Sequence, residues 1–346
     1  MPRITRVIVV AYVVFNLAIA GTLIADPAQL DATYRGGPMT PTREFLWFSI
    51  ASFGCCAGAP RAPRGPTRRP PSRPTTGPTP PACRPRPGPG SRSTMTHLAG
   101  SRARRRAAIV ALVLVAIGVL VIAAQPPIRQ PQDYHDFADH RALLGVPNNG
   151  DVLSNLGFVI AGLSGLLACA RRSFGARPQY LVFFAGVALT GAGSAYYHLA
   201  PDDARLVWDR LPMTLGFMGL LAAIIGERLD PRRGHQLLPP LLVLGLASVL
   251  HWYALDDLRS YAAVQFGSLL IIITLLLLAP RRPADTHPQL LWMGLAWYVL
   301  AKLLEALDRP IFAATNQLIS GHTLKHLAAA VGVWLIARMI SRRARQ

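Results

Sequence analysis

Eight long apolar segments constrain the fold of this chain more than any other feature of its sequence. A helix needs roughly 20 apolar residues to cross the hydrocarbon core of a bilayer, and each segment has this length or nearly so. Backbone polar groups inside lipid must be satisfied within the segment itself, which favours helices. The sequence therefore predicts an all-α polytopic membrane protein. The segments cover residues 107–124, 151–170, 179–199, 206–226, 236–253, 260–280, 288–307 and 320–340.

The charged residues predict how these segments are threaded. Lys and Arg number 36 against 17 Asp and Glu, an excess that in a soluble protein would suggest a nucleic-acid partner. Here the arginines fall in an N-terminal linker and in alternate loops between apolar segments, so we expect no nucleic-acid partner. The positive-inside rule makes those loops, and both ends of residues 95–346, cytoplasmic. The last seven segments then form a bundle entered from outside, preceded by one extra transmembrane helix.

The first part of the chain differs in composition from the rest. Residues 1–56 contain apolar stretches, and the following residues 57–94 are rich in proline and arginine. Between Ala57 and Arg92 there are 12 Pro and 8 Arg but no acidic residue and no Lys, which predicts a disordered linker. A second hypothesis is that residues 1–94 are not native and that the working protein starts at Met95. Peptides upstream of Met95 in mass spectra of the native protein would contradict it.

The remaining chain is predicted to have two parts. Residues 95–150 contain the leading transmembrane helix and an acidic outer loop, and residues 151–346 contain the seven-helix domain. The cysteines show no paired metal-ligand spacing, so we assign them no role. They are Cys55, Cys56, Cys83 and Cys169.

Three histidines and an aspartate fall at the same ends of the predicted helices. His198 ends an outward-running helix, Asp209 begins the next inward one, and His322 and His326 begin the last inward one. The threading therefore places all four near the outer leaflet. Two imidazoles four residues apart on one helix face, with a third on a neighbouring helix, suit a metal that keeps an open water position. Ser194 lies one turn deeper on the His198 face.

Each of these residues also has a simpler interpretation. A single histidine near a helix end is usually an interfacial residue, and Ser194 with its neighbouring glycines could serve only close helix packing. Asp209 followed by Arg210 could form an interfacial ion pair. Three histidines in register shift the balance, because ionisable side chains in membrane segments are costly and usually functional. We therefore favour a metal site.

The spacing of these residues resembles the signature of the alkaline ceramidase family. That family belongs to the CREST superfamily of seven-helix membrane hydrolases, which also contains the adiponectin and progestin receptors. The resemblance extends from about residue 133 to the C-terminus. It implies a CREST-like seven-helix bundle of a bacterial type, in a bacterial plasma membrane. The motif consists of Ser194-x-x-x-His198, Asp209 eleven residues further on, and His322-x-x-x-His326.

The resemblance also implies roles for these residues. His198, His322 and His326 would bind zinc, and Ser194 and Asp209 would hold the attacking water and the reacting carbonyl. The substrate would be a membrane lipid, a ceramide-like N-acyl lipid whose amide bond is hydrolysed. Residue chemistry is consistent with this, because a metal activates water, a carboxylate can shuttle its proton, and a hydroxyl can donate to an oxyanion. Two alternatives remain: a metal-stabilised receptor or binding protein without significant turnover, and a structural zinc that links three helices.

The acidic outer loop predicts a second metal site. Oxygen ligands suit calcium, and the resemblance implies a calcium site in this region, with Asp136 and Asp139 as ligands and Asn148 as a later one. The carboxylates are fewer than the family pattern has, and a closing Glu is missing. The alternative is a plain helix cap by Asp151 beside an acidic loop.

A stripe of charge on the segment 288–307 has two interpretations. Lys302, Glu305 and Asp308 could be a self-neutralising ion pair at the interface. Alternatively, Glu305 could orient one of the zinc histidines, because metal-bound imidazoles usually donate their other N–H to a carboxylate or carbonyl.

Overall fold

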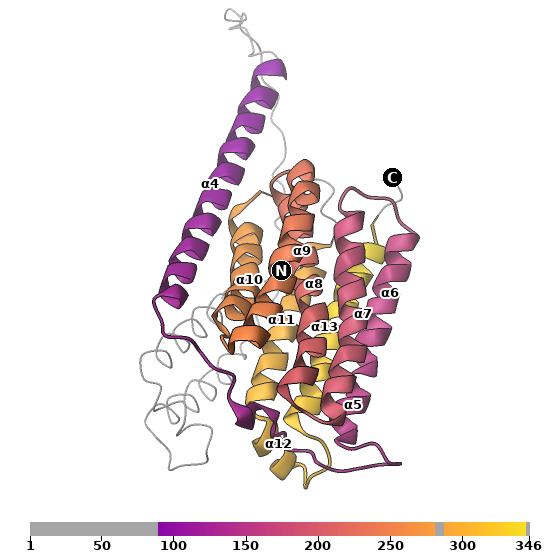
Figure 1. Ribbon diagram of the computed structural model, residues 1–346. Helices are drawn as coiled ribbons and strands as arrows, with labels where there is room; N and C mark the ends of the chain where they lie inside the picture. The colour runs from indigo at the N-terminus through magenta and orange to yellow at the C-terminus, as the bar shows by residue number, and fades with distance from the viewer. Residues whose placement is uncertain (1–88, 281–286, 344–346) are drawn as a thin grey trace, which may run out of the picture. The chain divides into compact units, whose positions relative to one another are not determined.

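The fold is described by a computed structural model that covers residues 89–280 and 287–343 (Figure 1). Within these ranges the regular structure is helical, which confirms the all-α prediction. In chain order the elements are α4 (Pro89–Ala123), η2 (Gln132–His135), α5 (Asn149–Ser154), α6 (Leu156–Ala170), α7 (Arg177–Leu199), α8 (Asp203–Arg228), α9 (Pro231–Leu255), α10 (Arg259–Leu278), α11 (Pro288–Ala306), α12 (Asp308–Ala314) and α13 (Gly321–Ser341).

Seven of the described helices are long and apolar enough to cross a membrane. The predicted segment 288–307 differs from the rest, because α11 and α12 qualify only together and are bent by 75° at their junction. Pro310 explains the break: it has no N–H to donate to the carbonyl of Ala306, and its ring would clash with that carbonyl in a continuous helix. The predicted segment 288–307 matches α11, and the chain changes direction just after it.

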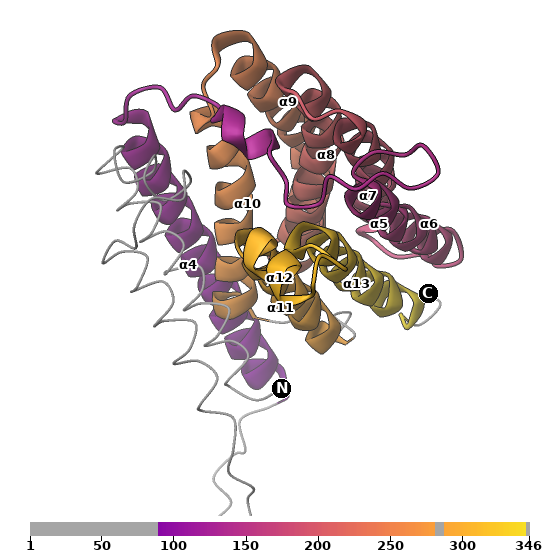
Figure 2. The ribbon, with the colours of Figure 1, turned by 90° about the horizontal axis from the view of Figure 1, so that it is seen from below.

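The helices of the bundle pack in an order that brings the last one back to the first. Helix α7 packs against α6 and α8, and α8 in turn packs against α9 and α10. Helix α13 packs against both α6 and α11, so it lies between an early helix and a late helix of the bundle (Figures 1 and 2). Residues at the N-terminal end of α13 therefore lie beside the C-terminal end of α7 and the start of α8.

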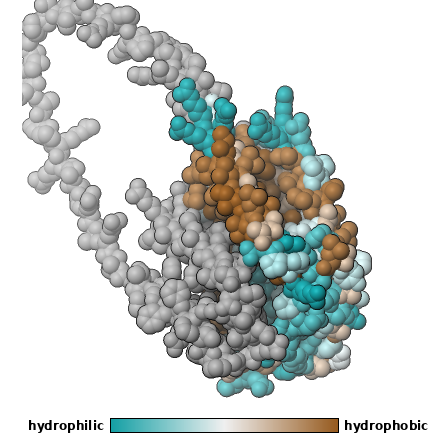
Figure 3. Space-filling view, turned by 60° about the vertical axis from the view of Figure 1, so that its left-hand side comes forward, coloured by the Kyte–Doolittle hydropathy of each residue, from teal (hydrophilic) through white to brown (hydrophobic). Residues whose placement is uncertain are grey.

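The outward-facing side chains are largely apolar. Leu112 and Leu120 on α4 are 67% and 69% exposed, and Val243 on α9 is 67% exposed. Figure 3 shows one face on which hydrophobic residues form a broad patch between hydrophilic ends. A patch of this size would be costly in water but is the expected lipid-facing surface of a membrane protein. The chain is thus a polytopic membrane protein.

The buried apolar side chains form two clusters. The larger one includes Ile224, Trp292 and Ile340 and fills the bundle toward the C-terminal end of α13. The smaller one includes Tyr197 and Trp252 and lies at the other end of the bundle. The three histidines lie at the same end as this smaller cluster.

The structure describes little of the N-terminal region. Helix α4 begins at Pro89, inside the predicted linker 57–94, and Met95 lies within it. The predicted apolar segment 1–56 and the remainder of the linker lie outside the described residues. The hypothesis that the working protein starts at Met95 therefore stays a prediction.

Candidate metal centre

The three predicted histidines lie together in the interior of the bundle. His198 is near the end of α7, His322 and His326 are in the first turns of α13, and all three are buried. Their ligand nitrogens lie within 4.8 Å of one another, and the Nε2 atoms of His198 and His322 are 3.2 Å apart. A tetrahedral zinc with Zn–N bonds of 2.0–2.1 Å requires about 3.3 Å between ligand nitrogens. One pair of nitrogens already has this separation, so the three imidazoles suit a metal ion.

Local contacts fix the start of α13 so that its histidines point inward. The Ser320 hydroxyl caps the helix by accepting a hydrogen bond from the N–H of Thr323 at 2.9 Å. The Asp308 carboxylate accepts a second one from the N–H of His322 at 2.7 Å. Gly321 permits this approach, because a Cβ at that position would meet the backbone of Leu304 and Asp308. The break between α11 and α12 thus provides the partner for the first turn of α13.

Ser154 orients one of the three imidazoles. Its hydroxyl lies 2.8 Å from Nδ1 of His326, and both side chains are buried. A partner on Nδ1 leaves Nε2 as the metal-facing nitrogen and holds the ring in place. The Glu305 carboxylate, for which we considered an orienting role, contacts Lys302 and Lys325 and makes no hydrogen bond to an imidazole within the described residues. No spacing rule pointed to Ser154, because it lies at the end of the short helix α5 and reaches α13 only in the folded bundle.

We expect Ser154→Ala to weaken zinc binding by about 10- to 100-fold, which is the usual cost of losing the outer partner of a metal-bound histidine. Competition with a chromophoric chelator in detergent would measure the affinity. Ser248→Ala is the matched control, because Ser248 is also a buried helical serine but donates to the carbonyl of Gly245 on α9. Equal zinc affinity in the Ser154 variant and wild type would show that this contact does not orient a ligand.

Ser194 and Asp209 lie side by side on the facing surfaces of α7 and α8. Ser194 is buried, and its side chain interacts with the Asp209 carboxylate. The helices approach closely here, since a Cβ on Gly193 would overlap the carbonyl oxygen of Trp208. Pro212 cannot donate to that carbonyl, which leaves room around it. Because Gly193 has no side chain, α7 and α8 come close enough for Ser194 and Asp209 to lie side by side.

Gly193→Ala is expected to destabilise the protein by about 1–3 kcal/mol, the usual cost of overpacking, because backbone blocks the added methyl group. It should also lower turnover beyond the loss of folded protein, since it separates Ser194 from Asp209. Thermal unfolding in detergent and the rate per folded protein would measure the two effects. Gly267→Ala on α10 is the control, because an added Cβ there meets nothing within 4 Å. Unchanged stability in both variants would contradict this account.

Arg210 does not pair with Asp209 in the way that the simpler interpretation requires. Within the described residues no salt bridge joins the two side chains. The guanidinium of Arg210 lies 4.1 Å from the ring centre of Trp252 and 4.8 Å from that of Tyr261, and it donates to Gln130 at 2.9 Å. The charge of Arg210 still acts on the Asp209 carboxylate, which also interacts with Lys325 and Ser194.

The loop of residues 124–148 covers the histidines. The ring centre of Phe137 lies 4.6 Å from that of His198 and 4.3 Å from that of His322. The loop is held there by the N–H of Ala138, which donates to Asp308 at 2.9 Å, and by His135, which lies 2.8 Å from the hydroxyl of Tyr197. Phe137 therefore caps the imidazoles on the loop side.

The predicted calcium ligands have other partners. Asp136 pairs with Arg309 at 2.6 Å, and Asp139 pairs with Arg141 at 2.7 Å. Burial raises the pKa of Asp139, but the hydrogen bonds and charge of Arg141 outweigh it, so that pKa lies below its usual value. Asn148 donates its amide to the carbonyl of His198. Arginines thus neutralise both carboxylates in this structure, and the calcium site stays a prediction.

Asp151 is not a helix cap. Its carboxylate is buried and accepts hydrogen bonds from Thr323 at 2.7 Å and Ser320 at 3.1 Å, which joins α5 to α13. The residue at the cap position of α5 is Asn148, whose side chain makes no capping hydrogen bond. The expected cap by Asp151 was therefore wrong, and its carboxylate links two helices instead.

A charged cluster lies against the histidines. The Nζ atom of Lys325 is 3.0 Å from Nε2 of His322 and 2.9 Å from the Glu305 carboxylate, which also contacts Lys302. Lys325 also interacts electrostatically with Asp209. Lys325 was not predicted as a site residue, although its position between His322 and His326 placed it on α13.

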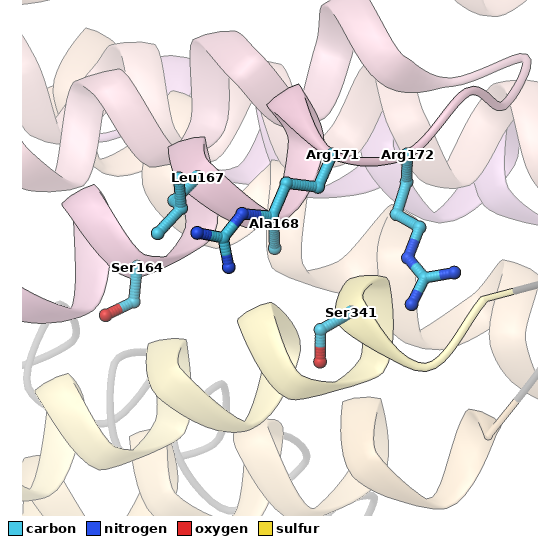
Figure 4. A pocket seen from close by; sticks show the side chains of 6 residues that line it. All are labelled: Ser164, Leu167, Ala168, Arg171, Arg172 and Ser341. Atoms are coloured by element: carbon cyan, nitrogen blue, oxygen red, sulfur yellow. The ribbon is translucent and has the colours of Figure 1, made fainter. Parts of the chain in front are cut away.

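A surface pocket lies at the opposite end of α13 from the histidines (Figure 4). It has a volume of about 350 Å³ and lies between α6 and α13. It is separated from the histidines by nearly the full length of a transmembrane helix, so it belongs to no part of the metal centre. Its lining residues are Ser164, Leu167, Ala168, Arg171, Arg172 and Ser341.

The fold and the site together define a polytopic membrane protein with a buried three-histidine centre next to a serine–aspartate pair. A comparison with protein families matches residues 150–342, more than half of the chain, to the ceramidase family. The chain belongs to the ceramidase family. A search of curated proteins and a search of solved structures gave no match.

Proposed function

We propose that this protein is a zinc-dependent intramembrane hydrolase that cleaves the amide bond of a ceramide-like N-acyl lipid. Membership of the ceramidase family makes the chain an amidohydrolase with a lipid substrate. The observation that carries the metal dependence is the convergence of three buried imidazoles from two helices. Buried imidazoles without a carboxylate partner favour a metal ion over an acid–base pair, because neutral rings are good zinc ligands.

His198, His322 and His326 would hold the zinc ion. When bound, the ion supplies Lewis acidity toward the carbonyl oxygen and lowers the pKa of water. The ring of His326 keeps its orientation through Ser154, and the ring of His198 is packed beneath Phe137.

Asp209 is the proposed base. Its carboxylate takes a proton from the attacking water and later delivers it to the nitrogen of the leaving amine. The hydroxyl of Ser194 lies beside the carboxylate and can donate to it while it is charged, a role supported by the interaction of the two side chains. Once Asp209 has taken the proton, this hydroxyl is free to donate to the oxyanion that develops on the carbonyl.

The proposed setting is a bacterial plasma membrane with the metal centre near the outer leaflet. Arginine-rich loops support cytoplasmic termini for residues 95–346. Labelling of single cysteines introduced at Arg172 and at Asp203 would test this orientation, with a membrane-impermeant reagent reaching only the second from outside.

Removal of the metal is the direct test of the proposed function. We expect fatty-acid release from an N-acyl lipid to disappear after chelation and to return with added zinc, because water alone is too weak an acid to be activated by the remaining groups. Release would be measured on the purified full chain with a panel of N-acyl lipids. Release that persists without metal would rule out the zinc mechanism, whereas no release from zinc-loaded protein would favour a receptor or a structural metal.

A further inference from the structure

The pocket between the ends of α6 and α13 collects positive charge. Arg171 and Arg172 line it from the C-terminal end of α6, and Ser341 lines it from the end of α13. Figure 4 shows both guanidinium groups on the side of α6 that faces α13. Within the residues that the structure describes, neither guanidinium makes an ion pair or a hydrogen bond with a protein group. The pocket therefore presents two sets of guanidinium donors to a ligand.

The acidic residues at this end of the bundle are engaged elsewhere. In the described part of the chain they are Glu227 at the end of α8 and Asp230 just before α9. Glu227 contacts Arg343 and Tyr180, and the Asp230 carboxylate accepts a hydrogen bond from the N–H of Arg232 at 2.9 Å. The counter-ion of the two pocket arginines is therefore not a side chain of the described residues.

The surface next to the pocket is apolar on both helices. Leu167 lines the pocket, and Leu163, one turn further along α6, is 55% exposed. Trp334 on α13 is 41% exposed and lies on the same helix face as Ser341, because seven residues make nearly two turns. Exposed tryptophans near the ends of membrane-spanning helices usually lie at the level of the lipid headgroups. A ligand with both an anionic group and acyl chains fits these surroundings better than a soluble anion does.

We propose that this pocket binds the phosphate group of an anionic phospholipid, whose acyl chains lie against Leu163 and Trp334. A guanidinium can donate two parallel hydrogen bonds to a phosphate, and the Ser164 hydroxyl in the pocket can donate another. Basic pockets between transmembrane helices bind the headgroups of anionic lipids by this chemistry. The pocket volume of about 350 Å³ lies within the usual range of ligand sites.

The lipid in this pocket is a second ligand and not the substrate. Along α13, 15 residues separate His326 from Ser341, which corresponds to about 22 Å at the rise of an α-helix. A headgroup bound here is therefore remote from the metal centre. It would stabilise the folded bundle, because it joins α6 to the helix that carries two of the three histidines. This inference does not depend on the proposed hydrolysis.

Lipid binding to the purified, delipidated full chain in neutral detergent tests the proposal. Native mass spectrometry and thermal unfolding would compare phosphatidylglycerol with phosphatidylcholine, which has the same phosphate but no net charge. We expect phosphatidylglycerol to bind about 10- to 100-fold more tightly, the range given by a hydrogen bond to a charged group, and to raise Tm as its concentration rises. Equal binding of the two lipids would overturn the proposal. Displacement by inorganic phosphate at a similar concentration would overturn the assignment to a lipid.

The double variant Arg171→Gln/Arg172→Gln should weaken phosphatidylglycerol binding about 10- to 100-fold. The matched control is Arg232→Gln/Arg233→Gln, which also removes two adjacent arginines at the same end of the bundle. Arg232 and Arg233 are exposed at the start of α9 and do not line the pocket. We expect this control to bind the lipid as the wild type does. Equal losses in the two double variants would overturn the proposal, because they would indicate general attraction to a basic surface.

A variant that keeps every charge tests the pocket itself. Ser164→Leu places a larger side chain in the pocket and should weaken phosphatidylglycerol binding about 10-fold or more, whereas Ser164→Ala should keep most of it. Thermal unfolding of the lipid-free variants shows whether each is folded. This comparison tests the proposal even if the double arginine variant does not fold. Binding of the lipid to Ser164→Leu as tightly as to wild type would show that the headgroup is not in this pocket.

Discussion

Asp209→Asn is expected to lower kcat by about 10²- to 10⁴-fold, the usual contribution of a positioned general base, while the protein keeps its zinc. The amide cannot take the water proton, but it has nearly the same size and can still accept a hydrogen bond from Ser194. The three imidazoles are untouched, so the metal content should match that of wild type. Single-turnover release of fatty acid and metal analysis of the same preparation would measure the two quantities.

The control for this prediction is Asp203→Asn, which changes a carboxylate at the start of α8 where Asp203 contacts His135 and Gln132. That variant should keep most of the turnover. Loss of zinc from the Asp209 variant would contradict its role as a base and assign the carboxylate to the metal itself. Full turnover in the Asp209 variant would show that Asp209 is not the general base.

His322→Ala should abolish both metal binding and hydrolysis. Loss of an outer partner alone costs about 10- to 100-fold in metal affinity, and loss of a ligand itself should exceed that. His322 faces His198 at 3.2 Å, so the substitution leaves only one ligand on α13 and one on α7. Zinc content after dialysis and fatty-acid release in zinc-supplemented buffer would be compared with wild type.

His251→Ala serves as the matched control for this variant. His251 also lies near the loop end of a transmembrane helix, but it is exposed and contacts Ser260 on α10. We expect it to keep zinc and turnover. If His322→Ala bound zinc as tightly as the control, the cluster would not be the metal site.

Much of the fold could be predicted because a backbone segment inside lipid has few alternatives to a helix. Apolar runs such as 151–170 and 260–280 correspond closely to α6 with α5 and to α10, since their backbone groups must be satisfied internally. Segment 288–307 likewise corresponds to α11, and Pro310 is the sequence feature that marks the change of direction after it. Hydropathy shows which segments can span the membrane but gives little information on where a helix bends.

The histidines could be anticipated from the sequence, but their surroundings could not. His198, His322 and His326 share one end of the bundle, a consequence of helix ends and alternate threading. Ser154 and Phe137 reach the imidazoles from a short helix and from a loop, and neither position is determined by spacing. Such contacts depend on how segments that are distant in the sequence pack together, and the hydrophobic pattern of one sequence does not show this.

The outer loop shows why composition alone does not establish the predicted calcium ligands. Aspartates spaced closely in a polar loop look like oxygen ligands, yet an arginine two residues from Asp139 serves as its counter-ion. Arg309, which pairs with Asp136, is far along the chain and cannot be matched to it from sequence. A count of acidic residues therefore gives little information on cation binding until their basic partners are known.

The aromatic cap formed by Phe137 has a consequence for how rates on this protein should be expressed. Since the Phe137 ring lies against the loop side of the histidines, we expect a lipid substrate to enter from the surrounding bilayer, where its concentration is expressed as a mole fraction. Diluting substrate with inert lipid at fixed total volume should then slow the reaction, whereas diluting the whole suspension with buffer should not. Inhibitors would likewise be ranked by how strongly they partition into the bilayer as well as by how they fit.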